Sequence, residues 1–189
     1  MRIITGKAKG LKLFTLDGED ITRPTTERVK EAVFSMLQFD IEGRSVLDLF
    51  SGSGQMALEA LSRGAGNAVL VDKSKDAVNI IKKNIDKTGM AAQSTVVMSD
   101  YMDFIKRNRG KKFDIIFIDP PYKAQMYASA LIALKEYEII KPTSMLICES
   151  DFDYDISSDE QRTKFETVKK QSKYSRSVIT IFEPKNEGA

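Results

Sequence analysis

Short apolar runs alternate with stretches of helical periodicity from residue 45 onward. The apolar runs are Ser45–Phe50, Ala68–Val71, Thr95–Met98, Phe113–Ile118 and Met145–Cys148. Helices are predicted between them, over residues 55–63, 74–88, 101–108 and 124–137. Near-continuous apolar strands that alternate with helices predict a doubly wound α/β fold, with a parallel sheet covered on both faces. Two further runs, Lys164–Ser172 and Ser177–Glu183, are joined by a short turn and predict an antiparallel hairpin that closes one edge.

The chain before residue 43 has a different pattern and predicts a small extension. Two short strands are expected at Arg2–Thr5 and Leu11–Leu16, as a hairpin. A helix is then expected from an N-cap at Thr25 or Thr26 to about Phe39. We therefore predict an N-terminal extension over 1–42 and a catalytic domain over 43–189. No Pro/Gly/Ser-rich linker separates them, so they are expected to pack together.

Composition narrows the possible chemistry. The 189 residues contain no histidine, which excludes Ser-His-Asp and Cys-His nucleophiles and every metal site that needs imidazole, and no metal is expected. The single cysteine, Cys148, excludes an intramolecular disulfide and favours a reducing cytoplasm. No apolar run reaches 18 residues, so no membrane partner is expected. The net charge of +2 does not by itself indicate a nucleic-acid binder.

A glycine turn follows the first parallel strand, in Asp48-Leu-Phe-Ser-Gly-Ser-Gly54. Gly52 and Gly54 allow a sharp turn and a close approach of the backbone to a ligand. Asp72 ends the next strand, 20 residues after Gly52, where a carboxylate can accept hydrogen bonds from the ribose of an adenosine cofactor. With Ala57 the string also fits the Gly-x-Gly-x-x-Ala dinucleotide fingerprint, so the motif alone is weak.

Asp48 helps to separate the two kinds of cofactor. A carboxylate at this turn would repel the pyrophosphate of NAD, whereas it would attract the ammonium of S-adenosylmethionine. Asp100 follows the third strand, where an acid can bind an adenine amino group. The structural alternative is that Asp48 caps a turn and Asp100 caps the next helix. The predicted cofactor contacts are Asp48, Phe50, Gly52, Gly54, Asp72 and Asp100.

The sharpest motif is Asp119-Pro120-Pro121-Tyr122, directly after the fourth strand. The prolines fix the backbone and remove two N–H donors, so the surface presents acceptors. Such acceptors can hold the hydrogens of an exocyclic amine on a nucleobase and stabilise the charge that develops as its nitrogen attacks a methyl group. Tyr122 can stack on the base. These four residues are predicted to be catalytic, against the alternative of a plain proline-rich turn.

Several stretches resemble the RsmD family of bacterial 16S ribosomal RNA guanine-N2 methyltransferases. They are Arg2-Ile-Ile-Thr-Gly-Lys-Ala-Lys-Gly10, Arg23-Pro-Thr-Thr-Glu-Arg-Val-Lys-Glu31, Leu58-Glu-Ala-Leu-Ser-Arg-Gly-Ala65, the glycine turn and the Asp-Pro-Pro-Tyr motif. Together they cover most of residues 2–122, and the last third matches only in strand pattern. Gln55-Met56-Ala57 departs from the small or aliphatic residues of the family, which affects the shape of the methionine pocket.

The resemblance implies a Rossmann-like seven-stranded fold, S-adenosylmethionine as cofactor, and a guanine of 16S ribosomal RNA as substrate, within a 30S particle or an assembly intermediate. It also implies that the Arg-Pro-Thr-Thr block borders the active site. Residues 1–12 add four basic side chains and no acid, which favours contact with phosphates. The predicted substrate contacts are Arg2, Lys7, Lys9, Arg23, Thr25 and Arg28.

Two other functions stay open at this point. The Asp-Pro-Pro-Tyr motif fits an adenine-N6 methyltransferase of DNA or RNA equally well, and only the N-terminal blocks favour guanine. An RNA-binding assembly factor without catalysis is the third possibility, although the intact glycine turn and acids disfavour it.

Overall fold

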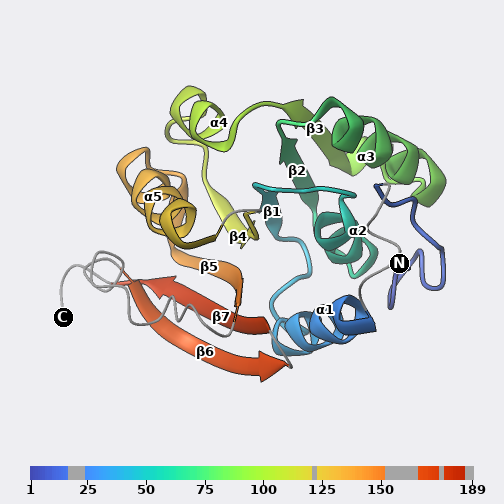
Figure 1. The fold of residues 1–189 in the computed structure, drawn as a ribbon, viewed down its shortest axis with the longest axis horizontal. Coiled ribbons are helices and arrows are strands. Elements are labelled where there is room, and N and C mark those ends of the chain that lie inside the picture. The colour runs from blue at the N-terminus through green and yellow to red at the C-terminus, as the bar shows by residue number, and fades with distance from the viewer. Residues whose placement is uncertain (17–23, 121–122, 152–165, 175–176, 186–189) are drawn as a thin grey trace.

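A computed structural model describes residues 1–16, 24–120, 123–151, 166–174 and 177–185, and its centre is one seven-stranded sheet (Figure 1). The strands are β1 (Ser45–Asp48), β2 (Asn67–Asp72), β3 (Ser94–Met98), β4 (Phe113–Ile118), β5 (Ile140–Asp151), β6 (Glu166–Tyr174) and β7 (Ser177–Pro184). Their order is β3-β2-β1-β4-β5-β7-β6. The first five run parallel, and β7 is antiparallel to both β5 and β6. The predicted α/β fold with a closing hairpin is confirmed.

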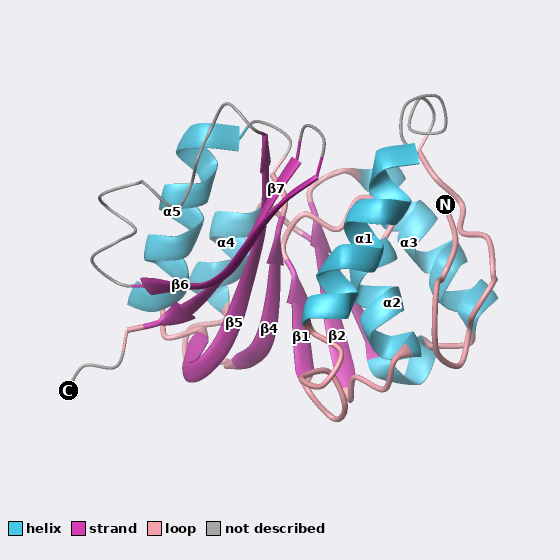
Figure 2. Ribbon diagram, turned by 90° about the horizontal axis from the view of Figure 1, so that it is seen from below, coloured by secondary structure: helices cyan, strands magenta, loops and turns pink. Residues whose placement is uncertain are grey.

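Helices cover both faces of the sheet. They are α1 (Pro24–Met36), α2 (Gln55–Ser62), α3 (Lys75–Thr88), α4 (Tyr101–Arg107) and α5 (Lys123–Glu136), with a short 3-10 turn, η1, at Ala91–Gln93. Figure 2 shows α4 and α5 on one face and α1, α2 and α3 on the other. In the described part of the chain, none of the helices has the length and apolar character needed to cross a bilayer.

The alternation of side chains along the strands explains why the sheet needs a layer of helices on each face. Successive residues of a strand point to opposite faces, and each face has its own buried cluster. Val46 and Ile115 belong to the cluster under α1 and α2, whereas Leu47 and Ile116 belong to the cluster under α4 and α5. The strands are apolar on both sides, so both faces must be buried, and this fixes the layered architecture.

The N-terminal segment, residues 1–16, does not form two strands of the predicted length. Arg2 and Lys12 make a single antiparallel bridge, and no longer ladder joins the two stretches. The backbone donors of Ile4 and Thr5 go instead to the carboxylate of Glu59 on α2, at 2.7 and 3.0 Å. The two stretches still form a minimal hairpin, because Ile3 donates its N–H to the carbonyl of Leu11 at 3.0 Å and Leu13 donates its N–H to the carbonyl of Met1 at 2.9 Å. The predicted hairpin is confirmed, and only the predicted length of its strands was wrong.

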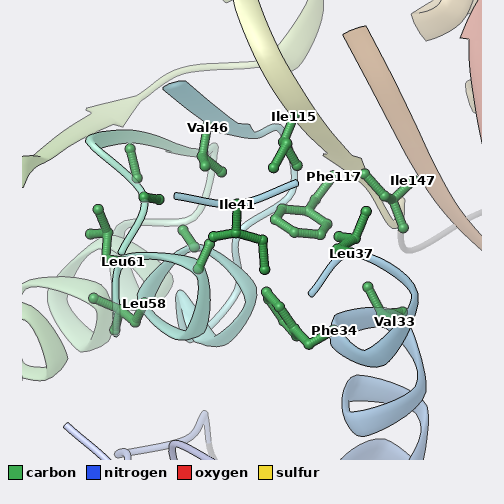
Figure 3. Packing of buried hydrophobic residues seen from close by; sticks show 14 of the residues in the cluster. Val33, Phe34, Leu37, Ile41, Val46, Leu58, Leu61, Ile115, Phe117 and Ile147 are labelled. Carbon is green, nitrogen blue, oxygen red and sulfur yellow. The ribbon is translucent and has the colours of Figure 1, made fainter. Parts of the chain in front are cut away.

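α1 completes the core on its face of the sheet. Phe34 and Leu37 are fully buried and lie against Phe117 of β4, with the Phe34 and Phe117 ring centroids 5.9 Å apart. Figure 3 shows these side chains together with Ile41 and Val46. The described residues before Gly43 therefore share one hydrophobic core with the sheet and its helices. The division into an extension and a catalytic domain at residue 42 stays a prediction.

Candidate active site

The candidate site lies where the strand order reverses, between β1 and β4. From β1 the chain continues to β2 and β3 on one side, and β4 and β5 lie on the other. In open parallel sheets, ligands bind at the carboxyl ends of the strands at this switch point. The last residue of β1, Asp48, pairs in register with Phe117 near the end of β4. The two strands are parallel, so the loops that follow them begin side by side. The glycine turn and Asp119 therefore emerge from neighbouring strands at the same edge.

The glycine turn has the backbone that its sequence predicts. Gly52 has φ 53° and Gly54 has φ 78°, both in the left-handed region that favours glycine. A Cβ at Gly54 would lie 3.0 Å from Cδ2 of Leu70, a tight contact, so space as well as conformation favours glycine there. Gly54 is the N-cap of α2 and offers no side-chain cap. The turn therefore brings bare backbone to the start of a helix, as an anionic or polar ligand group requires.

The 20-residue spacing predicted Asp72 as a ribose contact, and the structure shows that this acid also binds the glycine turn itself. Its Oδ2 accepts from the backbone N–H of Gly52 at 2.9 Å, and its Oδ1 accepts from that of Ser74 at 2.8 Å. The carboxylate thus fixes the turn against the end of β2. Each carboxylate oxygen has a second lone pair, so Asp72 can still accept a hydrogen bond from a ribose hydroxyl.

Asp48 is a buried carboxylate with an unused acceptor. Its residue surface is 4% exposed, and its Oδ2 has no hydrogen-bond partner among the described residues. Burial raises the pKa of Asp48 to about 7, although hydrogen bonds from the backbone of Ala57 and Phe50 oppose the shift. A buried acid of this kind is stabilised by a cation placed beside it.

Gln55 carries a second unused acceptor at the same turn. Its Oε1 is buried and has no partner, and in the described part of the chain only Oδ2 of Asp48 and Oγ of Ser94 share this condition. Two of these three orphan oxygens therefore flank the glycine turn, at Asp48 and Gln55. The ammonium of S-adenosylmethionine supplies the donors that such acceptors lack, so the residues present fit this cofactor.

Asp100 and Phe50 lie at the same edge in different roles. Asp100 is the N-cap of α4, and its Oδ1 accepts from the N–H of Met102 at 2.9 Å, which confirms the capping alternative. Phe50 packs against Tyr101, with ring centroids 5.1 Å apart and ring planes tilted by 43°. Tyr101 was not predicted as a site residue, and only its position after β3 could have indicated it. Contacts of Asp100 and Phe50 with a cofactor stay predictions.

The Asp-Pro-Pro-Tyr motif is described in its first half only. Asp119 is exposed at the end of β4, and Pro120 behind it is buried. This places an exposed carboxylate at the edge of the sheet from which the glycine turn also emerges. Pro121 and Tyr122 lie outside the described residues.

The predicted substrate contacts lie at the surface where they are described. Arg2, Lys7, Lys9 and Arg28 are exposed, and Arg2 pairs with Glu27 of α1 at 3.4 Å. Arg23 is not among the described residues. Thr25 lies in the first turn of α1, and only its backbone is described. Their contact with RNA stays a prediction. The described residues contain no cluster of three acids or cysteines that could hold a metal ion.

Sequence reasoning missed two buried polar residues behind the site. Glu59 on α2 is fully buried and contacts Lys30 of α1 at 3.3 Å and Arg63 at 2.9 Å. Asn84 on α3 is also fully buried. Asn84 continues the apolar face of α3, three residues after Ile81, so a polar residue at a core position was the available signal.

The seven-stranded fold, with acidic residues around a glycine turn at one edge of the sheet, defines a class of proteins. This class is the Rossmann-like methyltransferases. The model of a protein family described as "Conserved hypothetical protein 95" matches residues 1–183. The chain belongs to this family, and the resemblance to RsmD proteins is confirmed.

Individual relatives agree with this assignment. The putative rRNA methyltransferase YlbH of Bacillus subtilis is 36% identical over 80% of this chain and 83% of its own length. Ribosomal RNA small subunit methyltransferase D of Haemophilus influenzae is 34% identical, over 86% and 85%. Among solved structures, a putative methyltransferase, yhhF, from Escherichia coli aligns over 99% of both chains, with a TM-score of 0.86 and 26% identity.

Proposed function

We propose that this protein transfers a methyl group from S-adenosylmethionine to the exocyclic N2 amine of a guanine in 16S ribosomal RNA. One observation carries the proposal: the register of β1 with β4 brings Asp119 beside the glycine turn, with Asp48 aligned with Phe117. A carboxylate that can accept from an amine and a glycine turn that can bind the methyl donor thus lie at the same edge of the sheet. Relatives named as small-subunit RNA methyltransferases support ribosomal RNA as the substrate.

The cofactor would be held by the turn and by three acids. Asp72 would accept from the ribose hydroxyls, Asp48 would pair with the ammonium, and Asp100 would lie at the adenine. When bound, S-adenosylmethionine supplies an electrophilic methyl group on a sulfonium. The protein would contribute position and charge, because the buried carboxylate of Asp48 would lie beside the amino-acid part and the glycines would admit the ligand to the backbone.

The target amine would be oriented by acceptors. The lone pair of a guanine N2 amine is delocalised into the ring, so its nitrogen is a weak nucleophile. The carboxylate of Asp119 and the carbonyl of Pro120 would accept its two hydrogens and stabilise the positive charge that grows on the nitrogen. The proton can leave after transfer, so no strong general base is required. The ring of Pro121 would restrict the backbone, and the ring of Tyr122 would stack on the base.

The RNA would lie over the N-terminal extension. Arg2, Lys7 and Lys9 are exposed and basic, and Arg28 is exposed on α1. Such side chains bind phosphates without reading sequence, so the shape of the folded RNA would select the nucleotide. We infer a 30S particle or an assembly intermediate in the cytoplasm as the substrate.

Substitution of Asp119 tests the chemistry separately from cofactor binding. Asp119→Asn keeps the shape and removes the charge, so methyl transfer to 30S particles should fall by at least about 100-fold. The affinity for S-adenosylhomocysteine, measured by calorimetry, should stay within about threefold. Asp86→Asn, at an exposed acid on α3, is the matched control and should be as active as the wild type. Full activity of Asp119→Asn would refute the assignment.

A further inference from the structure

One buried side chain joins the N-terminal segment to the glycine turn. Oδ1 of Asn84 accepts from the backbone N–H of Phe14 at 2.7 Å. Its Nδ2 donates to the carbonyl of Phe14 at 2.9 Å and to the carbonyl of Ser53 at 2.8 Å. Ser53 stands between Gly52 and Gly54, so Asn84 connects the segment to the middle of the turn. In Figure 1 the dark-blue segment runs beside α2 and α3.

The same segment is fixed to the helix that leaves the turn. Ala8 donates its N–H to Oγ of Ser62 at 3.0 Å, and Lys7 donates its N–H to the carbonyl of Ser62 at 2.8 Å. Gly6 permits this approach, because a Cβ there would lie 1.7 Å from the Ser62 carbonyl oxygen. The N-terminal segment is thus held at both ends of the turn–α2 unit, by Asn84 at one end and by Ser62 at the other.

We propose that Asn84 is a positioning residue that couples cofactor binding to the order of the N-terminal segment. The inference rests on the proposed cofactor site. Ser53 lies between two glycines whose backbones have wide freedom, so the bond from Asn84 restricts which turn conformations are populated. A cofactor that binds the ordered turn therefore also favours the docked segment, and the docked segment favours the cofactor by the same factor.

Asparagine is the residue that this position requires. The site presents one N–H and two carbonyls, and an asparagine amide offers one acceptor and two donors on a short side chain. Aspartate would place an acceptor against two carbonyls, and alanine would leave all three groups without this partner. The arrangement explains why a polar residue stands on the apolar face of α3.

Calorimetry with S-adenosylhomocysteine measures the effect on affinity. Asn84→Ala should weaken binding by roughly 5- to 50-fold, because three hydrogen bonds that order the turn are lost. Asn108→Ala is the matched control, since Nδ2 of Asn108 donates to the carbonyl of Phe104 at the end of α4, away from the segment. Its affinity should stay within about twofold of the wild type. Equal affinity of Asn84→Ala and the wild type would overturn the inference and leave the proposed function intact.

Hydrogen exchange separates coupling from simple loss of stability. In the wild type, S-adenosylhomocysteine should slow amide exchange both in residues 51–54 and at Leu13 of the N-terminal segment. In Asn84→Ala, protection by the ligand should remain in the turn and be lost at Leu13, although the acceptor of the Leu13 N–H, the Met1 carbonyl, is unchanged. If the variant does not fold, the wild type alone tests the coupling. Protection by S-adenosylhomocysteine that is confined to the turn of the wild type would overturn it. A wild type that binds no S-adenosylhomocysteine would overturn both this inference and the proposed cofactor.

Discussion

Asp48 gives the sharpest prediction, because its burial makes cofactor affinity depend on pH. The pKa of Asp48 is raised to about 7 by burial, so at neutral pH about half of the cofactor-free molecules carry a protonated acid. The ionised fraction rises from about one tenth at pH 6 to about nine tenths at pH 8. If only the ionised form pairs with the ammonium, affinity for S-adenosylhomocysteine should rise about tenfold over this interval.

Two comparisons isolate the Asp48 contribution. Asp48→Asn is neutral at every pH, so its affinity should be flat between pH 6 and 8, and at pH 8 it should be roughly 10- to 100-fold weaker than the wild type. Methylthioadenosine lacks the amino-acid part of the cofactor, so its binding should not vary with pH in either protein. Calorimetry at pH 6, 7 and 8 with both ligands gives all of these values.

The same acid predicts a stability effect of definite sign. Its pKa is higher in the folded protein than the ordinary value of 3.8 for an aspartate, so the folded state holds the proton more tightly. The free energy of unfolding of the cofactor-free protein therefore decreases as pH rises from about 4 to about 7, by up to roughly 4 kcal/mol from this group. Asp48→Asn should be more stable than the wild type at pH 8. A wild type whose S-adenosylhomocysteine affinity is flat with pH, or weakens as pH rises, would refute this reasoning.

Three further predictions concern the parts that hold the site. Gly6→Ala places a Cβ 1.7 Å from the Ser62 carbonyl oxygen and should lower the free energy of unfolding by more than about 3 kcal/mol in denaturant titrations; a smaller loss would contradict the docking of the N-terminal segment. Glu59→Gln removes the partner of buried Lys30 and should cost about 3–5 kcal/mol in the same assay, whereas a loss under about 1 kcal/mol would contradict a buried ion pair. Burial alone would raise the pKa of Asp114, but hydrogen bonds from Lys141 and Ser45 lower it, so Asp114→Asn should be less stable than the wild type at pH 7. Thermal melts should show this difference shrinking as pH falls below about 4, and a constant difference would exclude the ionised carboxylate as its source.

Much of the fold was predictable because its strands are buried on both faces. The run Phe113–Ile118 coincides with β4, and the glycine and proline positions marked the turns. Met145–Cys148 became the middle of a longer strand, β5, because its ends pair with β4 and β7 through residues that are not all apolar. The hydrophobic pattern predicts the buried centre of a strand. It does not indicate how far backbone hydrogen bonding to neighbouring strands extends beyond that centre.

The site was predictable where residue chemistry and spacing coincide. The spacing of 20 residues from Gly52 singled out Asp72 as a ribose contact, and the structure places this acid against the turn, where it accepts from the N–H of Gly52 at 2.9 Å. The contact with a cofactor ribose stays a prediction. Glu59 and Asn84 were missed, because each satisfies backbone groups 54 to 70 residues away in sequence. Such pairings depend on tertiary structure, and the helix face alone indicates only that a polar group is buried.

The identity of the modified nucleoside tests the central claim most directly. 30S particles from cells that lack this protein would be incubated with the purified protein and labelled S-adenosylmethionine, and their 16S RNA digested for mass spectrometry. The proposed function predicts one labelled nucleoside, N2-methylguanosine, at a single position, and no label with Asp119→Asn. Label in N6-methyladenosine, or no transfer by a protein that binds the cofactor, would contradict it.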